Sequence, residues 1–220
     1  MNNISQEDYL TTIYRNSNED GEIKPNLLAE KLEISNAAVT DMLKKLSRDG
    51  LVNYKKYKSI TLTNEGEQYA RNMLRRHRIW EVFLNQTLGM PWDKIHEEAE
   101  KLEHSSSDDL INLLEKFLEY PTVDPHGYPI PDKNGKIKKE KSLKTINELE
   151  QNDIVVVARV NDQVKDLLTY LTKIGIELGT EIKVKDKLNY DGSVLIETNK
   201  KEINISKKIA SNIFAETKKK

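Results

Sequence analysis

A proline-rich segment, residues 121–142, divides this chain of 220 residues into two parts with different sequence patterns. The segment holds four of the six prolines, two of the nine glycines and a run of lysines, and this composition disfavours a continuous helix or strand. Apolar residues before the segment repeat mostly with helical spacing, whereas those after it occur in short alternating runs. We therefore interpret the segment as a linker between a mainly helical part and a small β part.

The first 64 residues contain three predicted helices followed by a predicted hairpin. Pro25 is suited to start the second helix, Ser35 or Asn36 to cap the third, and Gly50 to end it. The predicted helices are residues 6–15, 24–32 and 36–49, and the predicted strands are residues 51–54 and 59–63. This order of elements is that of a winged helix-turn-helix domain.

Positive charge gathers in this predicted domain. Between residues 36 and 60 six lysines and arginines stand against two carboxylates. A charge run alone is more often a solvated face, but its position on a hairpin after a helix-turn-helix favours contacts with DNA phosphates. The start of the third helix would then reach base edges in the major groove of double-stranded DNA. The predicted DNA-binding residues are Ser35, Asn36, Ala37, Ala38, Thr40, Asp41, Lys44, Lys45, Lys55, Lys56 and Lys58.

The next part, residues 65–120, is predicted to be helical and contains a concentration of metal-ligand residue types. His96, Glu100, Glu103 and His104 share one face of a predicted helix, and His77 lies four residues before Glu81 on the preceding one. Between residues 91 and 119 nine carboxylates stand against three lysines, so this region suits a cation. The chain has no cysteine, so a metal would be held by imidazole and oxygen ligands.

Two further patterns concern assembly and the second part of the chain. Apolar residues within 74–84 and 110–118 exceed what one small bundle buries, which indicates a homodimer.

After the linker, short strands and one helix predict a small β-barrel. The predicted strands are residues 154–160, 181–186, 194–198 and 202–205, and the predicted helix is residues 166–174.

Several classes of protein are disfavoured by the sequence. No apolar run reaches the roughly 20 residues of a membrane helix, and residues 1–20 lack the apolar stretch of a signal peptide, so we expect a cytoplasmic protein without membrane contact. The run HEEAE at 96–100 resembles the zinc-protease motif but ends in Glu where that motif has His. No phosphate-binding loop or nucleophile motif occurs. We therefore do not expect an enzyme.

Three runs together resemble the diphtheria toxin repressor family of metal-dependent regulators: RHRIWE at 76–81, HEEAEKLEH at 96–104 and DPHGYPIP at 124–131. The resemblance covers nearly the whole chain. It implies a mainly α fold with small β parts and three domains. These are a winged helix-turn-helix domain at 1–64, a helical metal-binding and dimerisation domain with the proline-rich linker at 65–142, and an SH3-like, FeoA-like domain at 143–220.

The resemblance also implies two metal sites in each chain. The residues carried over from the family form a primary and an ancillary ligand set, and His126 of the linker motif is given a structural role. The primary set is Asp8, Glu100, Glu103 and His104. The ancillary set is His77, Glu81 and His96, completed from the SH3-like domain near Asp162 or Gln163.

The identity of the ligands favours Mn(II), with Fe(II) as the alternative. Iron-sensing members of the family place Cys and Met where this chain has Glu100 and Asp8, and an oxygen and imidazole set suits the harder ion. Thr11 stands where short manganese regulators have a further Glu, so the resemblance implies two separated sites. Asp8 belongs to the first helix of the DNA-binding domain, and we expect metal to join that domain to the second.

The implied function is a metal-dependent transcriptional repressor of metal homeostasis that binds a double-stranded DNA operator as a homodimer. Two alternatives stay open at this point. One is a metal-independent winged-helix regulator whose acidic helix contacts another protein. The other is a metal-dependent hydrolase or oxidase fused to a DNA-binding domain.

Overall fold

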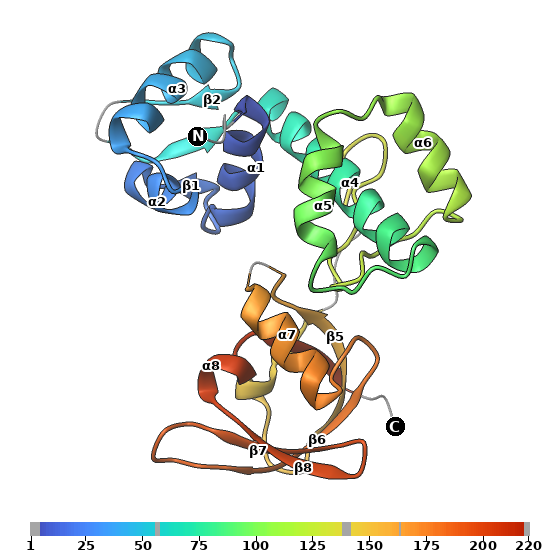
Figure 1. The fold of residues 1–220 in the computed structure, drawn as a ribbon. Coiled ribbons are helices and arrows are strands. Elements are labelled where there is room, and N and C mark those ends of the chain that lie inside the picture. Colours follow the sequence, from blue (N-terminus) through green and yellow to red (C-terminus); the bar gives the residue numbers. More distant parts are fainter. Residues whose placement is uncertain (1–4, 56–57, 138–141, 163, 218–220) are drawn as a thin grey trace.

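The computed structural model describes residues 5–55, 58–137, 142–162 and 164–217, which form three groups of elements (Figure 1). The first group confirms the predicted winged helix-turn-helix. Its sheet has the order β1-β3-β2, and the strand β1 was not predicted because two residues are too few to show alternation. The elements are α1 (Gln6–Asn16), β1 (Glu22–Ile23), α2 (Pro25–Lys31), α3 (Asn36–Arg48), β2 (Val52–Asn53) and β3 (Ile60–Leu62).

The core of this first group is built from amphipathic helices. Tyr9, Leu10 and Ile13 of α1 are buried in the same apolar cluster as the buried residues of α3. The first turn of α1 is fixed by a capping box, in which the Ser5 hydroxyl accepts from the Asp8 amide and the Asp8 carboxylate accepts from the Ser5 amide at 2.7 Å. Asp8 therefore has one oxygen committed to the start of the helix.

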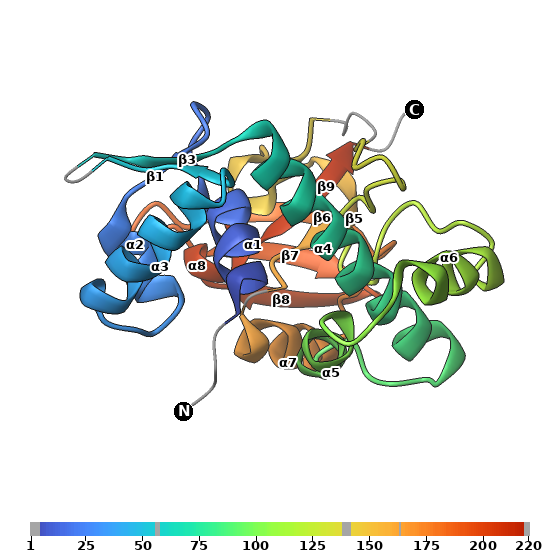
Figure 2. The same ribbon diagram turned by 90° about the horizontal axis from the view of Figure 1, so that it is seen from above.

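A long helix leads from this group into the second. This group consists of α4 (Asn64–Val82), a π-helical turn η1 (Phe83–Thr87), α5 (Ile95–Glu103) and α6 (Asp108–Phe117). Gly66 in the first turn of α4 is required by close packing, because a Cβ there would lie 2.0 Å from the carbonyl oxygen of Leu51. The contact fixes the direction in which α4 leaves the hairpin, and Figure 2 shows α4 running from beside α1 towards α5 and α6.

The interpretation of residues 121–142 as a linker is wrong for residues 121–137, which fold into a packed loop. The Ile130 amide donates to Thr122, Val123 and Pro129 form an antiparallel bridge, and Asp124 and His126 are buried. The loop joins the third group where the Val160 amide donates to the His126 carbonyl at 3.0 Å. Proline and glycine exclude a helix or strand here, but hydrogen bonds within the loop satisfy its buried backbone. Residues 138–141 lie outside the described ranges.

The third group is an antiparallel sheet of order β4-β9-β5-β6-β7-β8, curled around an apolar core and covered on one side by α7 (Figure 1). It confirms the predicted SH3-like part, and β5 and β7 have the predicted bounds. Its elements are β4 (Lys144–Thr145), η2 (Ile146–Glu148), β5 (Ile154–Val160), α7 (Lys165–Ile174), β6 (Glu181–Lys187), β7 (Val194–Thr198), β8 (Lys201–Ile205), α8 (Lys207–Ala210) and β9 (Ile213–Thr217). The strands β4 and β9 and the helix α8 were not predicted.

The third group docks on the second through the turn before α5. The indole of Trp92 donates to Thr172 on α7 at 2.7 Å, and the Thr169 hydroxyl donates to Asp93. Trp92 also packs against the apolar core of the sheet. Among the described residues, no helix combines the length and the apolar character needed to cross a membrane.

Candidate metal centres and DNA-binding surface

One group of predicted ligands lies between the first and second parts of the molecule, and we call Asp8, Glu103 and His104 the interdomain cluster. Their ligand atoms all lie within 4.8 Å of one another. Nε2 of His104 is 3.1 Å from Oδ1 of Asp8 and 3.6 Å from Oε1 of Glu103. Asp8 comes from α1, whereas the other two residues stand at the end of α5. The cluster therefore spans the junction that the sequence predicted a metal to bridge.

Glu7 joins this cluster although no sequence argument singled it out. Its carboxylate accepts a hydrogen bond from Nδ1 of His104 and another from the Tyr69 hydroxyl, at 2.8 Å. Burial opposes the charged form of His104, but the bond to Glu7 and the nearby carboxylates raise its pKa above the usual value. Glu7 and His104 are 97 positions apart, so no local spacing could have paired them.

A second group of predicted ligands, the buried cluster, consists of His77 and Glu81 on α4 with His96 on α5. Nε2 of His77 is 3.0 Å from Oε1 of Glu81 and 3.0 Å from Nδ1 of His96, and that Nδ1 is 3.3 Å from the Glu81 oxygen. The side chain of Glu81 is fully buried. Spacing of four residues on one helix placed His77 beside Glu81, as predicted.

Glu103 connects the two clusters. One of its oxygens faces His104, and the other accepts from Nδ1 of His77 at 2.5 Å. As a result, His77 has one ring nitrogen held by a carboxylate and the other directed at Glu81 and His96. A metal ligand histidine commonly has this arrangement, in which a second carboxylate fixes the ring.

The buried carboxylate of Glu81 is stabilised by the histidines around it. Burial opposes protonation of His96, yet hydrogen bonds to Glu100 and Glu81 raise its pKa to about 10. Burial would raise the pKa of Glu81, but His77 and the neighbouring histidines hold it well below its usual value. A divalent cation could supply the same compensation in place of protons. Imidazole and carboxylate groups are suitable ligands for Mn, Fe and Zn.

A third group, the loop cluster, shares Glu81 with the buried cluster and adds Asp124 and His126 from the packed loop. All three residues are buried, and Nδ1 of His126 is 3.7 Å from Oε2 of Glu81. Within the described structure, Oε2 of Glu81, Oδ2 of Asp124 and Nδ1 of His126 have no hydrogen-bond partner. Burial and repulsion from Glu81 raise the pKa of Asp124 to about 6. Buried polar atoms without hydrogen bonds can accept a cation, but Nε of Arg78 already lies 3.5 Å from Oδ2 of Asp124 and compensates part of this charge.

The remaining predicted ligands are placed elsewhere. Glu100 lies beside His96, with 3.4 Å between its Oε1 and the histidine Nε2, and the interdomain cluster is formed without it. Asp162 lines a pocket of about 230 Å³ together with Arg15, Arg78 and Tyr128, and the buried cluster is formed without it. Gln163 lies outside the described residues. The sequence analysis gave His126 only a structural role and gave Asp124 no role as a ligand.

The predicted DNA-binding residues lie along α3, from its N-cap to its last turn, and on the hairpin. Ser35 caps α3 by accepting from the Ala38 amide, and residues 35–38 are exposed. Lys44 pairs with Asp41 at 3.0 Å on the exposed face of α3. Lys55 and Lys58 are exposed at the hairpin turn, and Lys56 lies outside the described residues. Their contact with DNA stays a prediction.

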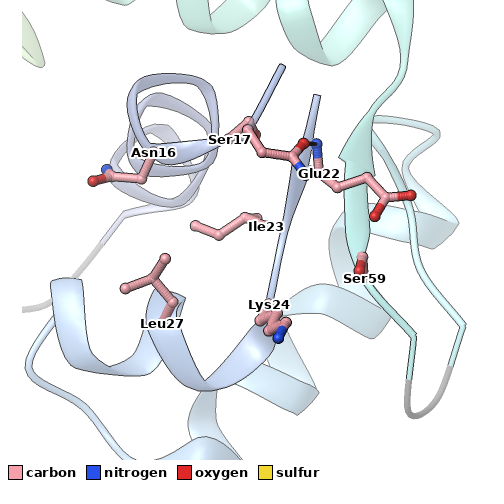
Figure 3. A pocket seen from close by; sticks show the side chains of 8 residues that line it. Asn16, Ser17, Glu22, Ile23, Lys24, Leu27 and Ser59 are labelled. Atoms are coloured by element: carbon pink, nitrogen blue, oxygen red, sulfur yellow. Dashed lines mark hydrogen bonds between the residues drawn. The ribbon is translucent and has the colours of Figure 1, made fainter. Parts of the chain in front are cut away.

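A separate pocket of about 290 Å³ lies in the first group, between the end of α1, β1 and the start of α2 (Figure 3). Its lining includes Glu22, Lys24 and Ser59, and none of its lining residues belongs to a metal-ligand cluster. The pocket is thus separate from the three clusters.

Comparison with known proteins identifies similar proteins along the whole chain. Residues 3–60 match the N-terminal DNA-binding domain of iron-dependent repressors, residues 63–132 match their metal-binding and dimerisation domain, and residues 144–217 match the FeoA domain. The diphtheria toxin repressor of Corynebacterium glutamicum is 30% identical over 218 residues, which cover 94% of each chain. The iron-dependent repressor IdeR of Mycobacterium leprae is 36% identical over 133 residues, 60% of this chain and only 58% of that relative.

Solved structures show the same arrangement. A manganese-dependent transcriptional repressor in complex with manganese superposes with a TM-score of 0.88 at 30% identity, covering 97% of this chain and 100% of the other. The structure of ScaR with bound Cd²⁺ gives a TM-score of 0.82 at 34% identity, again covering 97% and 100%.

Proposed function

The chain belongs to the diphtheria toxin repressor family of metal-dependent, DNA-binding repressors, and on that premise we propose that it represses transcription when loaded with a divalent metal. The operator would be double-stranded DNA bound by the winged helix, and the regulated process would be metal homeostasis. No catalysis is part of this function. The observation that carries the proposal is the interdomain cluster, in which α1 and α5 contribute ligands to one point.

Metal at the interdomain cluster would act by restricting the winged helix. Asp8 belongs to α1, whereas Glu103 and His104 stand at the end of α5, so a bound ion would join a helix of the first group to a helix of the second. The ion binds more tightly to the arrangement in which α1 is held beside α5 than to arrangements in which the winged helix can reorient. It favours the DNA-binding arrangement by that difference in binding free energy. The chemistry that the metal supplies is charge neutralisation and coordination.

We propose Mn(II) as the metal, with Fe(II) as the alternative. The ligands of all three clusters are oxygen and imidazole nitrogen, and the chain has no cysteine. Such ligands suit Mn(II) and are also accepted by Fe(II). Similar structures contain manganese and cadmium, so the fold admits more than one ion.

A second metal would be bound through Glu81. One oxygen of this carboxylate faces His77 and His96, and the other faces His126 and lies within reach of Asp124. We propose that the ion uses either the buried cluster or the loop cluster, because one buried carboxylate offers limited charge for two adjacent cations.

We propose a homodimer of three-domain chains, with domains at 1–64, 65–142 and 143–220. Leu110, Leu113 and Phe117 of α6 are exposed by 41%, 66% and 64% and lie on one face of the helix. A second copy of the chain would cover this face, in keeping with the dimerisation domain that the family comparison names. Two winged helices would then meet operator half-sites about one helical turn apart.

An operator gel shift with and without Mn(II) tests the proposal. Wild-type protein should bind DNA more tightly with Mn(II), and Glu103→Ala combined with His104→Ala should lose that difference. Glu30→Ala, an exposed substitution on α2, should behave as wild type and serves as the control. Equal binding by the double variant with and without metal is expected, whereas a preserved Mn(II) response in that variant would refute the proposed switch.

Titration calorimetry separates the two rival functions. A metal-independent regulator would bind no Mn(II) at micromolar concentration, whereas we expect two sites per chain. A metal-dependent hydrolase would require an open coordination position and a substrate cavity beside the metal. Turnover that is lost in the double variant would favour that alternative.

A further inference from the structure

Both ring nitrogens of His104 are engaged, and they face different partners. Nε2 faces the two other members of the interdomain cluster, Asp8 and Glu103. Nδ1 faces away from them and donates to Glu7. Only Nε2 of the ring is directed at the cluster, so the partner of Nδ1 determines the orientation of the ring and which nitrogen carries the proton.

From this geometry we propose that Glu7 is a positioning residue of the interdomain metal site. Its carboxylate holds a proton on Nδ1 of His104 and thereby leaves the lone pair of Nε2 free to bind the metal beside Asp8 and Glu103. The inference deepens the proposed function and rests on it.

The buried cluster supplies an independent example of the same arrangement. There, Nδ1 of His77 donates to Glu103, and Nε2 is left facing Glu81 and His96. In each cluster, Nδ1 of one histidine is hydrogen-bonded to a carboxylate that is not a member of that cluster: Glu7 for His104 and Glu103 for His77. Nε2 of the same ring points to the other ligand atoms of the cluster. Such carboxylates fix the ring orientation of a metal-bound histidine and raise its basicity.

Glu7 is itself held in place from α4. Its second oxygen accepts a hydrogen bond from the Tyr69 hydroxyl at 2.8 Å, and only 22% of its side chain is exposed. Glu7 therefore connects α1, α4 and the end of α5. A flexible surface glutamate would lose more conformational freedom on engaging His104.

The proposal predicts a graded series of Mn(II) affinities. Loss of a carboxylate that hydrogen-bonds to a metal-bound histidine typically weakens metal binding by about 10- to 100-fold. We expect a decrease in Mn(II) affinity in that range for Glu7→Ala. Glu7→Gln keeps an acceptor for the Nδ1 proton and should recover part of the loss. Tyr69→Phe should weaken binding less than Glu7→Ala, because the bond between Glu7 and His104 remains. Glu30→Ala is the matched control and should bind as wild type.

Nitrogen-15 NMR of Zn(II)-loaded protein gives a readout that a purely structural role would not change. In wild type the spectrum should show His104 with a proton on Nδ1 and metal on Nε2. In Glu7→Ala we expect exchange between tautomers or a change of the coordinating nitrogen, and Glu7→Gln should restore the wild-type pattern.

Three results would overturn the inference. The first is wild-type affinity in Glu7→Ala together with an unchanged tautomer. The second is coordination through Nδ1 in wild type, which would place Glu7 among the ligands or displace it on metal binding. The third is absence of micromolar Mn(II) binding by wild type, which would overturn the proposed function as well. The first two leave the metal switch intact, so the two failures are distinguishable.

Discussion

The interdomain and buried clusters use the same residue types in different surroundings. Asp8 and His104 are about one third exposed, whereas Glu81 and His77 are almost wholly inaccessible to solvent. The interdomain cluster joins α1 to the end of α5, and the buried cluster joins two helices of the same group. Water can solvate the first when no metal is bound, but the second must neutralise its own charge within the fold.

Because the two clusters differ in burial, we expect loss of metal or charge to have a different effect on the fold in each. When metal leaves the interdomain cluster, Asp8 and His104 stay in contact with water, and the buried Glu103 keeps its hydrogen bond to His77, so the fold should persist while the domains gain freedom. Removing charge from the buried cluster disturbs the packing between α4 and α5. The interdomain cluster is thus suited to sensing, and the buried cluster is suited to holding the helical domain together.

The largest expected effect is on stability and follows from removing Glu81. Glu81→Ala leaves buried imidazoles without their carboxylate, and breaking such a pair typically costs about 3 to 5 kcal/mol. Urea unfolding of metal-free protein in a chelator should show this loss. Glu65→Ala, an exposed substitution on the same helix, should lose only a small fraction of it. Similar losses in both variants would remove the contrast in burial on which the comparison depends.

Metal binding should raise the free energy of unfolding by less than the loss expected for Glu81→Ala, and each of the two sites should contribute separately. At a free concentration of 100 times Kd, one occupied site adds about 2.7 kcal/mol to the free energy of unfolding. We expect Asp8→Ala to lose the increment from the interdomain cluster and to keep the increment from the second site. The measurement is urea unfolding with and without Mn(II). Loss of both increments in Asp8→Ala would show that the two sites fill only together.

A still smaller effect is expected for Asp8 in the absence of metal. Asp8→Asn retains an oxygen that can accept from the Ser5 amide, so the metal-free protein should lose about 1 kcal/mol or less. Its affinity for Mn(II) should fall much more, because a neutral amide is a poorer ligand for a hard cation. Chelator-treated unfolding and calorimetry test the two parts, and a metal-free loss as large as that of Glu81→Ala would contradict the assignment.

The smallest effect concerns DNA and should leave both clusters unchanged. Lys55→Ala and Lys58→Ala should each reduce the slope of log affinity against log salt concentration by about 1, if each side chain neutralises one phosphate. Gel shifts with Mn(II) over a salt series measure this slope. Calorimetry should find unaltered Mn(II) affinity, and a changed metal affinity would mean that the hairpin and the interdomain cluster are coupled directly.

The sequence predicted those parts of the fold that depend on local patterns. The seven-residue strand β5 and the helix α3 have long enough periodicity to be recognised, and His77 and Glu81 are paired by their spacing on one helix. The two-residue strands β1 and β4 are too short to show a pattern. Their existence is decided by pairing with distant strands.

The partners that cross between elements could not be predicted in the same way. Glu7 meets His104 only after α1 packs on α4, and no feature of either residue indicates the other. The burial of Asp124 and His126 could not be predicted, because a segment rich in proline and glycine has the composition of an exposed linker whether or not it packs against the fold. Asp8 was found through family resemblance, and the structure places it beside His104.

The position of Glu103 between His104 and His77 has a consequence for how the protein responds to rising metal concentration. A metal on the buried cluster would fix His77, and through it the rotamer of Glu103, before the interdomain cluster binds its own ion. Any gain in affinity that results must be mutual, since linkage between two binding sites is reciprocal. Two-step calorimetric titration would measure this, and statistically independent binding would exclude it. If the linkage is positive, occupancy rises more steeply with metal concentration than for a single site, which would sharpen the threshold of the proposed repression.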